Sequence, residues 1–146
     1  MRVRDLLGRK PSTLITLDSQ APLQSAVRLL IEHNIGGLPV VTPEGAVVGF
    51  VAERDIVRAV HQHQTAVHQL PIRQVMRPPP VCEADEALED AMRRMTSQRQ
   101  RHLVVQDDGR LIGVISVGDV VKYRLEQLET ETAVLRDHVA GQRAAR

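Results

Sequence analysis

The sequence predicts an α/β fold of the α+β kind, made of two related units and a C-terminal helix. Two observations predict the units: the sequence repeats itself, and each copy alternates helical and strand periodicity. A third observation, an apolar heptad pattern near the C-terminus, predicts the final helix. Each unit is expected to be a small sheet with two helices.

The internal repeat fills most of the chain. A shift of 65 residues lays the segment from Thr16 over the segment from Val81, and a shift of 64 aligns GAVVGFVAERDIVR with GRLIGVISVGDVVK. The lead-ins VRDLL at residues 3–7 and IRQVM at residues 72–76 also agree. A unit of about 55 residues is marginal alone, so we expect the copies to pack about a pseudo-twofold axis. The matched pairs include Leu23 with Leu88, Ala26 with Ala91, Leu38 with Leu103, Val40 with Val105, Gly49 with Gly113 and Asp55 with Asp119.

The elements of the first unit can be assigned in order. Pro22 favours a helix start, and apolar residues at helical spacing run from Leu23 to Ile31 before Asn34 ends the helix. LPVV predicts a strand, PEG a turn, VVGFVA the second strand of a hairpin, and ERDIVRAV a second helix.

The second unit repeats this order. Apolar residues from Leu88 to Met95 share one helix face, RHLVV and LIGVIS predict a hairpin around the turn DDG, and a helix begins at Val117. The predicted boundaries are a first repeat at 1–62, a linker at 63–69, a second repeat at 70–124 and a helical tail at 125–146.

The composition argues against several classes of protein. Lys and Arg number 19 against 18 Asp and Glu, and with one Phe, one Tyr and no Trp there are few stacking platforms, so we expect no nucleic acid partner. No apolar run suits a secretory signal or a membrane span, so we expect no membrane partner. Cys82, the single cysteine, excludes an intramolecular disulfide. We expect a soluble cytoplasmic protein.

A recognisable series of motifs occurs twice: an amphipathic helix, a GGLPVV-like strand, a glycine hairpin, and Gly-apolar-apolar-Ser/Thr-x-x-Asp. In this order the chain resembles a tandem pair of CBS (cystathionine β-synthase-type) modules of the stand-alone bacterial kind, over roughly residues 3–122. The resemblance implies a flat module with two clefts between the repeats, and a ligand that contains adenosine. One departure is Val104, where the family usually has the proline seen at Pro39.

The end of the second hairpin is the strongest candidate for a ligand site. GVISVGDVV passes from a strand into a helix, whose free N-terminal N–H groups favour an anion. By the resemblance, Asp119 accepts hydrogen bonds from the ribose hydroxyls, Ser116 binds ribose or phosphate, Val114 forms an apolar wall, and Leu14 and Ile15 surround the adenine. A plain helix cap followed by a first-turn acid is the alternative.

The resemblance also implies that Arg54 and Arg101 face the ligand phosphates. Arginine suits that role because its planar guanidinium gives paired donors and keeps its charge. In a chain this rich in arginine, solvated surface positions are the alternative.

The matching position in the first repeat predicts a second, weaker site at Asp55, with Phe50 and Pro80. This site departs from the family pattern, which leaves three alternatives: the site binds weakly, takes a different ligand such as the other half of a dinucleotide, or stays empty. The departures are Ala52 in place of Ser or Thr, Gly118 where the other copy has Arg54, and Pro79-Pro80 in place of apolar strand residues.

Neither a metal site nor a catalytic site emerges from the sequence. His61, His63 and His68 lack the further ligand and outer shell that a metal requires. Cys82 has no histidine or lysine at motif spacing, which favours a buried structural thiol. The P-loop and Rossmann glycine motifs are absent, and we expect no enzyme.

The tail carries apolar residues at spacings of a heptad seam. An exposed helix with this stripe would either pack on its own domain or pair with a second copy. We expect a homodimer formed through the CBS faces and the C-terminal helix. The seam is Val121, Leu125, Leu128, Thr132, Leu135 and Val139.

Three functions from different classes follow. The leading one is a non-catalytic regulatory module that senses an adenine nucleotide, with AMP expected first and ADP, ATP or NAD(H) as alternatives, and that signals to an unknown protein effector. A structural or dimerisation scaffold with vestigial clefts is the second. A nucleotide-hydrolysing enzyme is the third.

Overall fold

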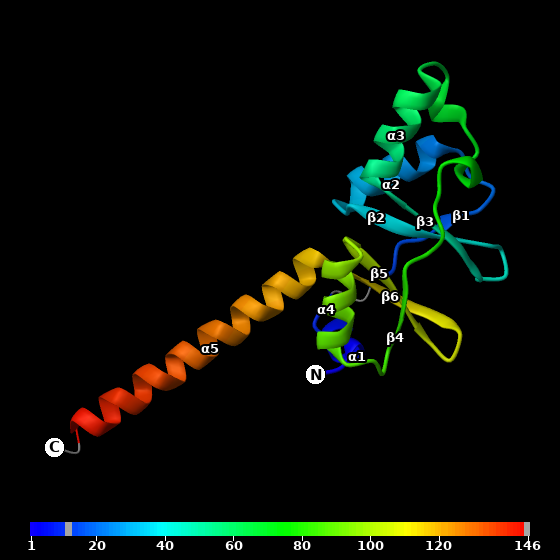
Figure 1. Ribbon diagram of the computed structural model, residues 1–146. Helices are drawn as coiled ribbons and strands as arrows, with labels where there is room; N and C mark the ends of the chain where they lie inside the picture. Colours follow the sequence, from blue (N-terminus) through cyan, green and yellow to red (C-terminus); the bar gives the residue numbers. More distant parts are fainter. Residues whose placement is uncertain (11–12, 145–146) are drawn as a thin grey trace.

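The computed structural model describes residues 1–10 and 13–144 and shows two stacked units with a long helix leaving the second one (Figure 1). The described residues form two three-stranded sheets, each with its own helices. The predicted fold class, two small sheets with helices and a C-terminal helix, is therefore confirmed.

The first unit holds a parallel and an antiparallel strand pair. Strand β1 runs parallel to β2, and β2 pairs with β3 in a hairpin. Helix α2 starts after Pro22 and ends at Asn34, which adopts the left-handed conformation at φ 51°. The elements are β1 (Leu17–Asp18), α2 (Leu23–His33), β2 (Gly37–Val41), β3 (Val47–Ala52) and α3 (Glu53–His63), followed by the short 3-10 turn η1 (Val67–Gln69).

The second unit repeats this topology with the same register. Leu17 faces Val40 in the first sheet, and Cys82 faces Val105 in the second, which matches the 65-residue shift. Both hairpins also carry a register irregularity at equivalent places. The elements are β4 (Val81–Glu83), α4 (Leu88–Ser97), β5 (His102–Asp107), β6 (Arg110–Ser116) and α5 (Val117–Ala144), and the short 3-10 turn η2 (Ile72–Gln74) precedes them in the chain.

The two units exchange their first segments. Helix α1 (Val3–Leu7), at the start of the chain, buries Val3 and Leu6 in the core of the second unit. Ile72 of η2, at the start of the second repeat, is fully buried in the core of the first unit. The sequence predicts matched lead-ins at these places but not their exchange, which ties the repeats together in both directions.

A third apolar cluster joins the two sheets. Phe50 and Ala52 of β3 pack with Val104 of β5, and partly buried residues of β6 extend the contact. Phe50 and Val104 are fully buried. This contact between repeats fixes the position of the cleft beside it.

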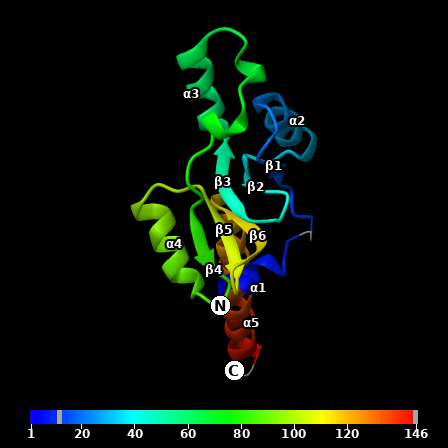
Figure 2. The same ribbon diagram turned by 90° about the vertical axis from the view of Figure 1, so that its right-hand side faces the viewer.

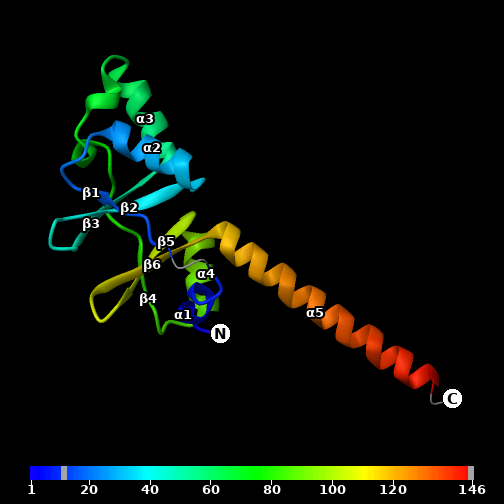
Figure 3. The same ribbon diagram turned by 180° about the vertical axis from the view of Figure 1, so that it is seen from behind.

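Helix α5 begins in the second unit and then projects away from both units (Figure 3). Val120 is buried in the second core and Tyr123 packs against it, so only the first turns are held by the domain. The helix is continuous across the predicted boundary between 124 and 125, and residues 145 and 146 of the predicted tail lie outside the described residues. Within the described ranges, no helix combines the length and apolar character needed to cross a membrane.

Candidate functional site

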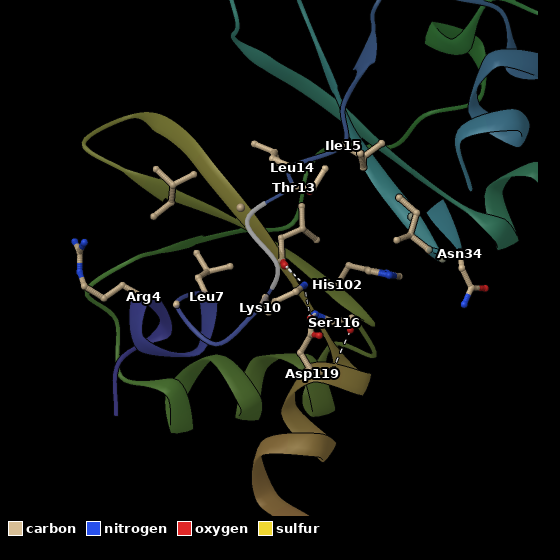
Figure 4. A pocket seen from close by; sticks show the side chains of 17 residues that line it. Arg4, Leu7, Lys10, Thr13, Leu14, Ile15, Asn34, His102, Ser116 and Asp119 are labelled. Atoms are coloured by element: carbon tan, nitrogen blue, oxygen red, sulfur yellow. Dashed lines mark hydrogen bonds and ion pairs between the residues drawn. The ribbon is translucent and has the colours of Figure 1, made fainter. Parts of the chain in front are cut away.

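A cavity of about 650 Å³ lies between the two repeats, next to the start of α5 (Figure 4). Its walls come from the segment after α1, from the end of α2 and start of β2, and from β6 with the first turn of α5. Five of the residues predicted for the ligand site line it together. The predicted residues in the lining are Leu14, Ile15, Val114, Ser116 and Asp119.

Ser116 and Asp119 form a reciprocal cap at the start of α5. The backbone N–H of Asp119 donates to Ser116 Oγ at 3.2 Å, and the backbone N–H of Ser116 donates to Asp119 Oδ2 at 2.8 Å. Ser116 therefore caps the helix. Both side chains are only partly buried, so the same groups that cap the helix also face the cavity.

Lys10 is the main feature that the sequence prediction missed. Its Nζ lies 2.6 Å from Asp119 Oδ2 and donates to the carbonyl oxygen of Val114 at 2.7 Å. Figure 4 shows this side chain reaching Asp119 from the segment opposite α5. The Asp119 carboxylate thus carries a built-in counter-ion, and the two side chains are 29% and 22% exposed.

The position of Lys10 follows from a difference between the two crossing segments. Residues 8–15 join the first lead-in to its strand, whereas residues 77–80 make the equivalent connection in the second repeat. The short segment pairs with β3, because Phe50 and Arg77 exchange both backbone hydrogen bonds, at 2.9 and 3.0 Å. At the equivalent place on β6, the Lys10 side chain bonds to Val114. Beside β6 the described residues therefore leave space that residues 77–80 fill beside β3.

At the predicted second site, the Asp55 carboxylate is already held by groups of the protein itself. Asp55 is 4% exposed and accepts the backbone N–H of Ala52 at 2.8 Å. Its carboxylate also contacts Arg58 at 3.2 Å and Arg77 at 3.4 Å. Phe50 is fully buried, and the guanidinium of Arg77 lies 5.9 Å from its ring centroid. A ligand at Asp55 would have to displace Arg77.

Pro80 and the two predicted phosphate contacts lie outside the lining of the described cavity. Pro80 is partly buried, and its carbonyl oxygen accepts the backbone N–H of Val104. Arg54 and Arg101 are exposed and do not belong to the described cavity lining. Arg101 immediately precedes His102, which lines the cavity, so its charge is close to the site by connectivity.

His102 contributes a neutral ring to the cavity wall. Burial is the main cause that lowers the pKa of His102 from 6.5 to about 4, and the positive charge of Arg77 adds to it. The ring tilts against Phe50, with centroids 5.2 Å apart. Nδ1 of His102 is buried without a hydrogen-bond partner among the described residues. A neutral ring nitrogen of this kind can donate to or accept from a ligand.

Cys82 and the histidines of α3 stand apart from this site. Cys82 is 2% exposed on β4, and burial raises the pKa of its thiol to about 12, with a smaller effect from Glu86. The prediction of a buried thiol is therefore confirmed. Among residues 1–10 and 13–144, no group of three or more His, Cys, Asp or Glu side chains is placed to hold a metal ion.

The fold and the cleft define a protein made of two linked repeats with a ligand-sized cavity at their junction. The family model for the CBS domain matches residues 3–62 and 72–126. The CBS domain-containing protein YhcV of Bacillus subtilis is 31% identical over 120 residues, which cover 81% of each chain. The chain therefore belongs to the CBS-domain family, as the sequence resemblance predicted.

Solved structures agree with this assignment. A CBS-domain-containing protein of Agrobacterium tumefaciens superposes with a TM-score of 0.78 at 36% identity, covering 84% of this chain and 98% of the other. A CBS-domain protein of Pyrobaculum aerophilum, solved in complex with AMP, gives a TM-score of 0.77 at 27% identity and covers 90% and 99% of the two chains. The CBS pair of a third protein is solved with 5-methylthioadenosine and S-adenosyl-L-methionine, at 27% identity and a TM-score of 0.76.

Some relatives are longer proteins. The chain spans 39% of an uncharacterised protein of Methanocaldococcus jannaschii that is 30% identical over 112 residues. It spans 22% of the L-aspartate semialdehyde sulfurtransferase of the same organism, at 29% identity over 119 residues. The similarity thus covers a minor part of that enzyme.

Proposed function

We propose that this chain is a non-catalytic regulatory module that binds an adenine nucleotide in the cavity between its two repeats. The observation that carries the proposal is the Asp119 carboxylate, which faces an open cavity of about 650 Å³ at the N-terminus of α5. AMP is the first candidate ligand, and ADP, ATP and NAD(H) are the others. The solved relatives with AMP and with S-adenosyl-L-methionine support a ligand of the adenosine class.

The cavity offers a matching group for each part of such a ligand. Leu14, Ile15 and Val114 provide apolar surface for the base. Asp119 can accept hydrogen bonds from ribose hydroxyls, and such bonds to a charged acceptor contribute about 1.5–3 kcal/mol. Lys10 would then exchange its contact with Asp119 for one with the ligand phosphate.

Binding at this place would couple the two repeats. Ile15 belongs to the segment that enters β1 of the first unit, whereas Asp119 belongs to α5 of the second. A ligand that contacts both sides favours one arrangement of the repeats over others. A protein effector with different affinities for the two arrangements would report ligand occupancy.

The test is calorimetric titration of the purified protein with AMP, ADP, ATP and NAD(H). We expect one of these to bind, and Asp119→Asn to weaken binding at least tenfold, because the neutral amide is a weaker acceptor for hydroxyls. Asp55→Asn is the matched control at the pseudo-equivalent position and should keep the affinity. Equal binding by wild type and Asp119→Asn would contradict the proposal that the nucleotide binds in this cavity. Steady turnover of ATP by pure protein would contradict the non-catalytic role.

A scaffold that regulates a partner without a ligand is the second candidate. It is favoured by the apolar side chains that remain exposed on α2, α3 and α5, among them Ile31 at 76% and Val57 at 66%. An unchanged melting temperature with every adenine nucleotide would select this candidate. In either case we propose a cytoplasmic homodimer, formed through the CBS faces and the C-terminal helix.

A further inference from the structure

The part of α5 beyond the second unit carries an unpartnered apolar stripe. Val121, Leu125, Leu128, Leu135 and Val139 are between 45% and 64% exposed, although all are large apolar residues. Spacings of four and three residues place them on one side of the helix, with Thr132 in the remaining position of the series. Such a regular stripe indicates a binding face for another helix.

The stripe points away from the chain's own domain. The domain side of α5 is defined by Tyr123, which packs on the second core and lies 5.4 Å from the guanidinium of Arg9. Arg9 also forms an ion pair with Glu126 on this side, at 3.7 Å. In the heptad, Tyr123 occupies the position opposite the seam. The stripe therefore stays free to meet a second molecule. Figure 3 shows that α5 projects away from both units.

The charges beside the stripe favour a parallel partner helix over an antiparallel one that overlaps the whole stripe. With Leu125 and Thr132 at positions a, and Leu128 and Leu135 at positions d, the flanking g positions are Arg124 and Glu131 and the flanking e positions are Glu129 and Arg136. In a parallel, in-register pair each g position meets the following e position of the other helix. Arg124 then meets Glu129 of the second copy, and Glu131 meets Arg136 of the second copy.

The antiparallel pair that overlaps the whole stripe brings like charges together. When Val121 lies opposite Val139 of the second copy, equivalent flanking positions face each other: Glu129 meets Glu129, Glu131 meets Glu131, and Lys122 meets Arg136. Like charges at these positions destabilise the pair, whereas the parallel arrangement repeats two attractive pairs on each side of the twofold axis.

We propose that α5 forms a parallel, in-register two-stranded coiled coil with α5 of a second copy of this chain. Thr132 fits within such a seam because its hydroxyl donates to the carbonyl oxygen of Leu128 at 2.9 Å and so brings no unsatisfied donor. The twofold axis runs along the tails, which places both second repeats at the same end of the coil. This inference deepens the proposed homodimer and does not depend on nucleotide binding.

Cysteine cross-linking tests the orientation in the full-length protein. In the parallel pair, residue 139 lies beside residue 139 of the second copy, within reach of a disulfide, whereas in the antiparallel pair the two are about 27 Å apart. We expect Val139→Cys to give mostly disulfide-linked dimers on oxidation. Wild type, with Cys82 buried, is the control and should give none. In an oxidised mixture of Val121→Cys and Val139→Cys, mass spectrometry should find like variants linked; predominant 121–139 links, or no linkage of Val139→Cys, would overturn the proposal.

A pair of variants tests whether the seam drives association. Leu128→Glu with Leu135→Glu should weaken dimerisation at least tenfold by light scattering, whereas Val134→Glu, outside the seam and 62% exposed, should leave it unchanged. If the double variant Leu128→Glu with Leu135→Glu is still a dimer, the coiled-coil proposal is wrong, but a homodimer through the CBS faces remains possible to test. If the wild type is a monomer, both modes of dimerisation are wrong. The nucleotide titration is independent of either outcome.

Discussion

At the scale of single residues, the ion pair between Lys10 and Asp119 sets the chemistry of the site. The carboxylate that would hold a ribose is already occupied by an ammonium at 2.6 Å. A neutral nucleoside has to compete with that ammonium, whereas a nucleotide offers a phosphate as its new partner. The pair therefore favours ligands that carry phosphate over adenosine alone.

Replacement of Lys10 should change this preference. In Lys10→Met, the affinity for adenosine should rise, because no counter-ion competes for Asp119, and the affinity for AMP should rise less or fall. We expect the ratio of AMP to adenosine affinity to drop by roughly tenfold, about 1.4 kcal/mol. Calorimetry measures both affinities. Lys122→Met, the same substitution on the exposed face of α5, is the control, and an unchanged ratio in Lys10→Met would rule out this role.

His102 should make the protein less stable in mild acid. Its pKa is about 4 in the folded state and 6.5 when unfolded, so the unfolded chain binds a proton first as pH falls. The stability present above pH 6.5 is therefore lost progressively toward pH 4, by about 2–3 kcal/mol. Denaturant titrations at several pH values measure this loss. We expect His102→Gln to flatten the curve between pH 6.5 and 5, and an identical slope would exclude His102 as its cause.

At the scale of elements, the packing of α1 on the second hairpin explains a glycine. A Cβ atom at Gly113 would lie 2.7 Å from Cδ2 of Leu7, so the lead-in helix and β6 touch where a side chain would stand. Met76 makes the equivalent approach to Gly49 in the other repeat. Both contacts join a lead-in to the hairpin of the opposite repeat, which indicates that each glycine is needed for the exchange.

A double-mutant cycle tests this contact. Gly113→Ala should destabilise the protein by about 1–3 kcal/mol through overpacking, and Leu7→Ala should destabilise it by loss of buried apolar surface. In the double variant the new methyl group fills space left by Leu7, so the combined cost should be smaller than the sum of the two. Urea unfolding measures all three. Strict additivity would mean that the two residues do not interact as described.

The elements themselves were largely predictable, because local patterns determine them. The VVGFVA strand has the predicted bounds, and Pro22 and Asn34 limit α2 as expected. Periodicity could not show that Val3 and Ile72 cross to opposite cores, because two equivalent lead-ins satisfy the same pattern whether or not they exchange. The structure resolves this choice.

The cleft was predicted in part. The motif that ends at Asp119 and the family resemblance predict five of the residues that line the cavity. They do not predict Lys10 or His102. Lys10 meets Asp119 across 109 positions of sequence, which no local pattern encodes. The usable signal was the longer first crossing segment at residues 8–15, which carries Lys10.

At the scale of the whole molecule, the pseudo-twofold symmetry is broken at the clefts. Figure 2 shows the first unit above the second, with α5 pointing away from the first unit. One cleft opens beside Val114, while at the matching place Arg77 pairs with Phe50 through the backbone and with Asp55 through its side chain. We therefore expect one nucleotide for each chain, and two for each coiled-coil dimer.

The number of ligands bound per chain is the measurement that tests this account most directly. Calorimetric titration of the wild-type protein with AMP, or with whichever adenine nucleotide binds, should give a stoichiometry near one per chain, lost in Asp119→Asn and kept in Asp55→Asn. Two equal sites per chain, or binding that depends on Asp55 and not on Asp119, would contradict the account of one open cleft at Asp119 and a second position where Arg58 and Arg77 hold Asp55.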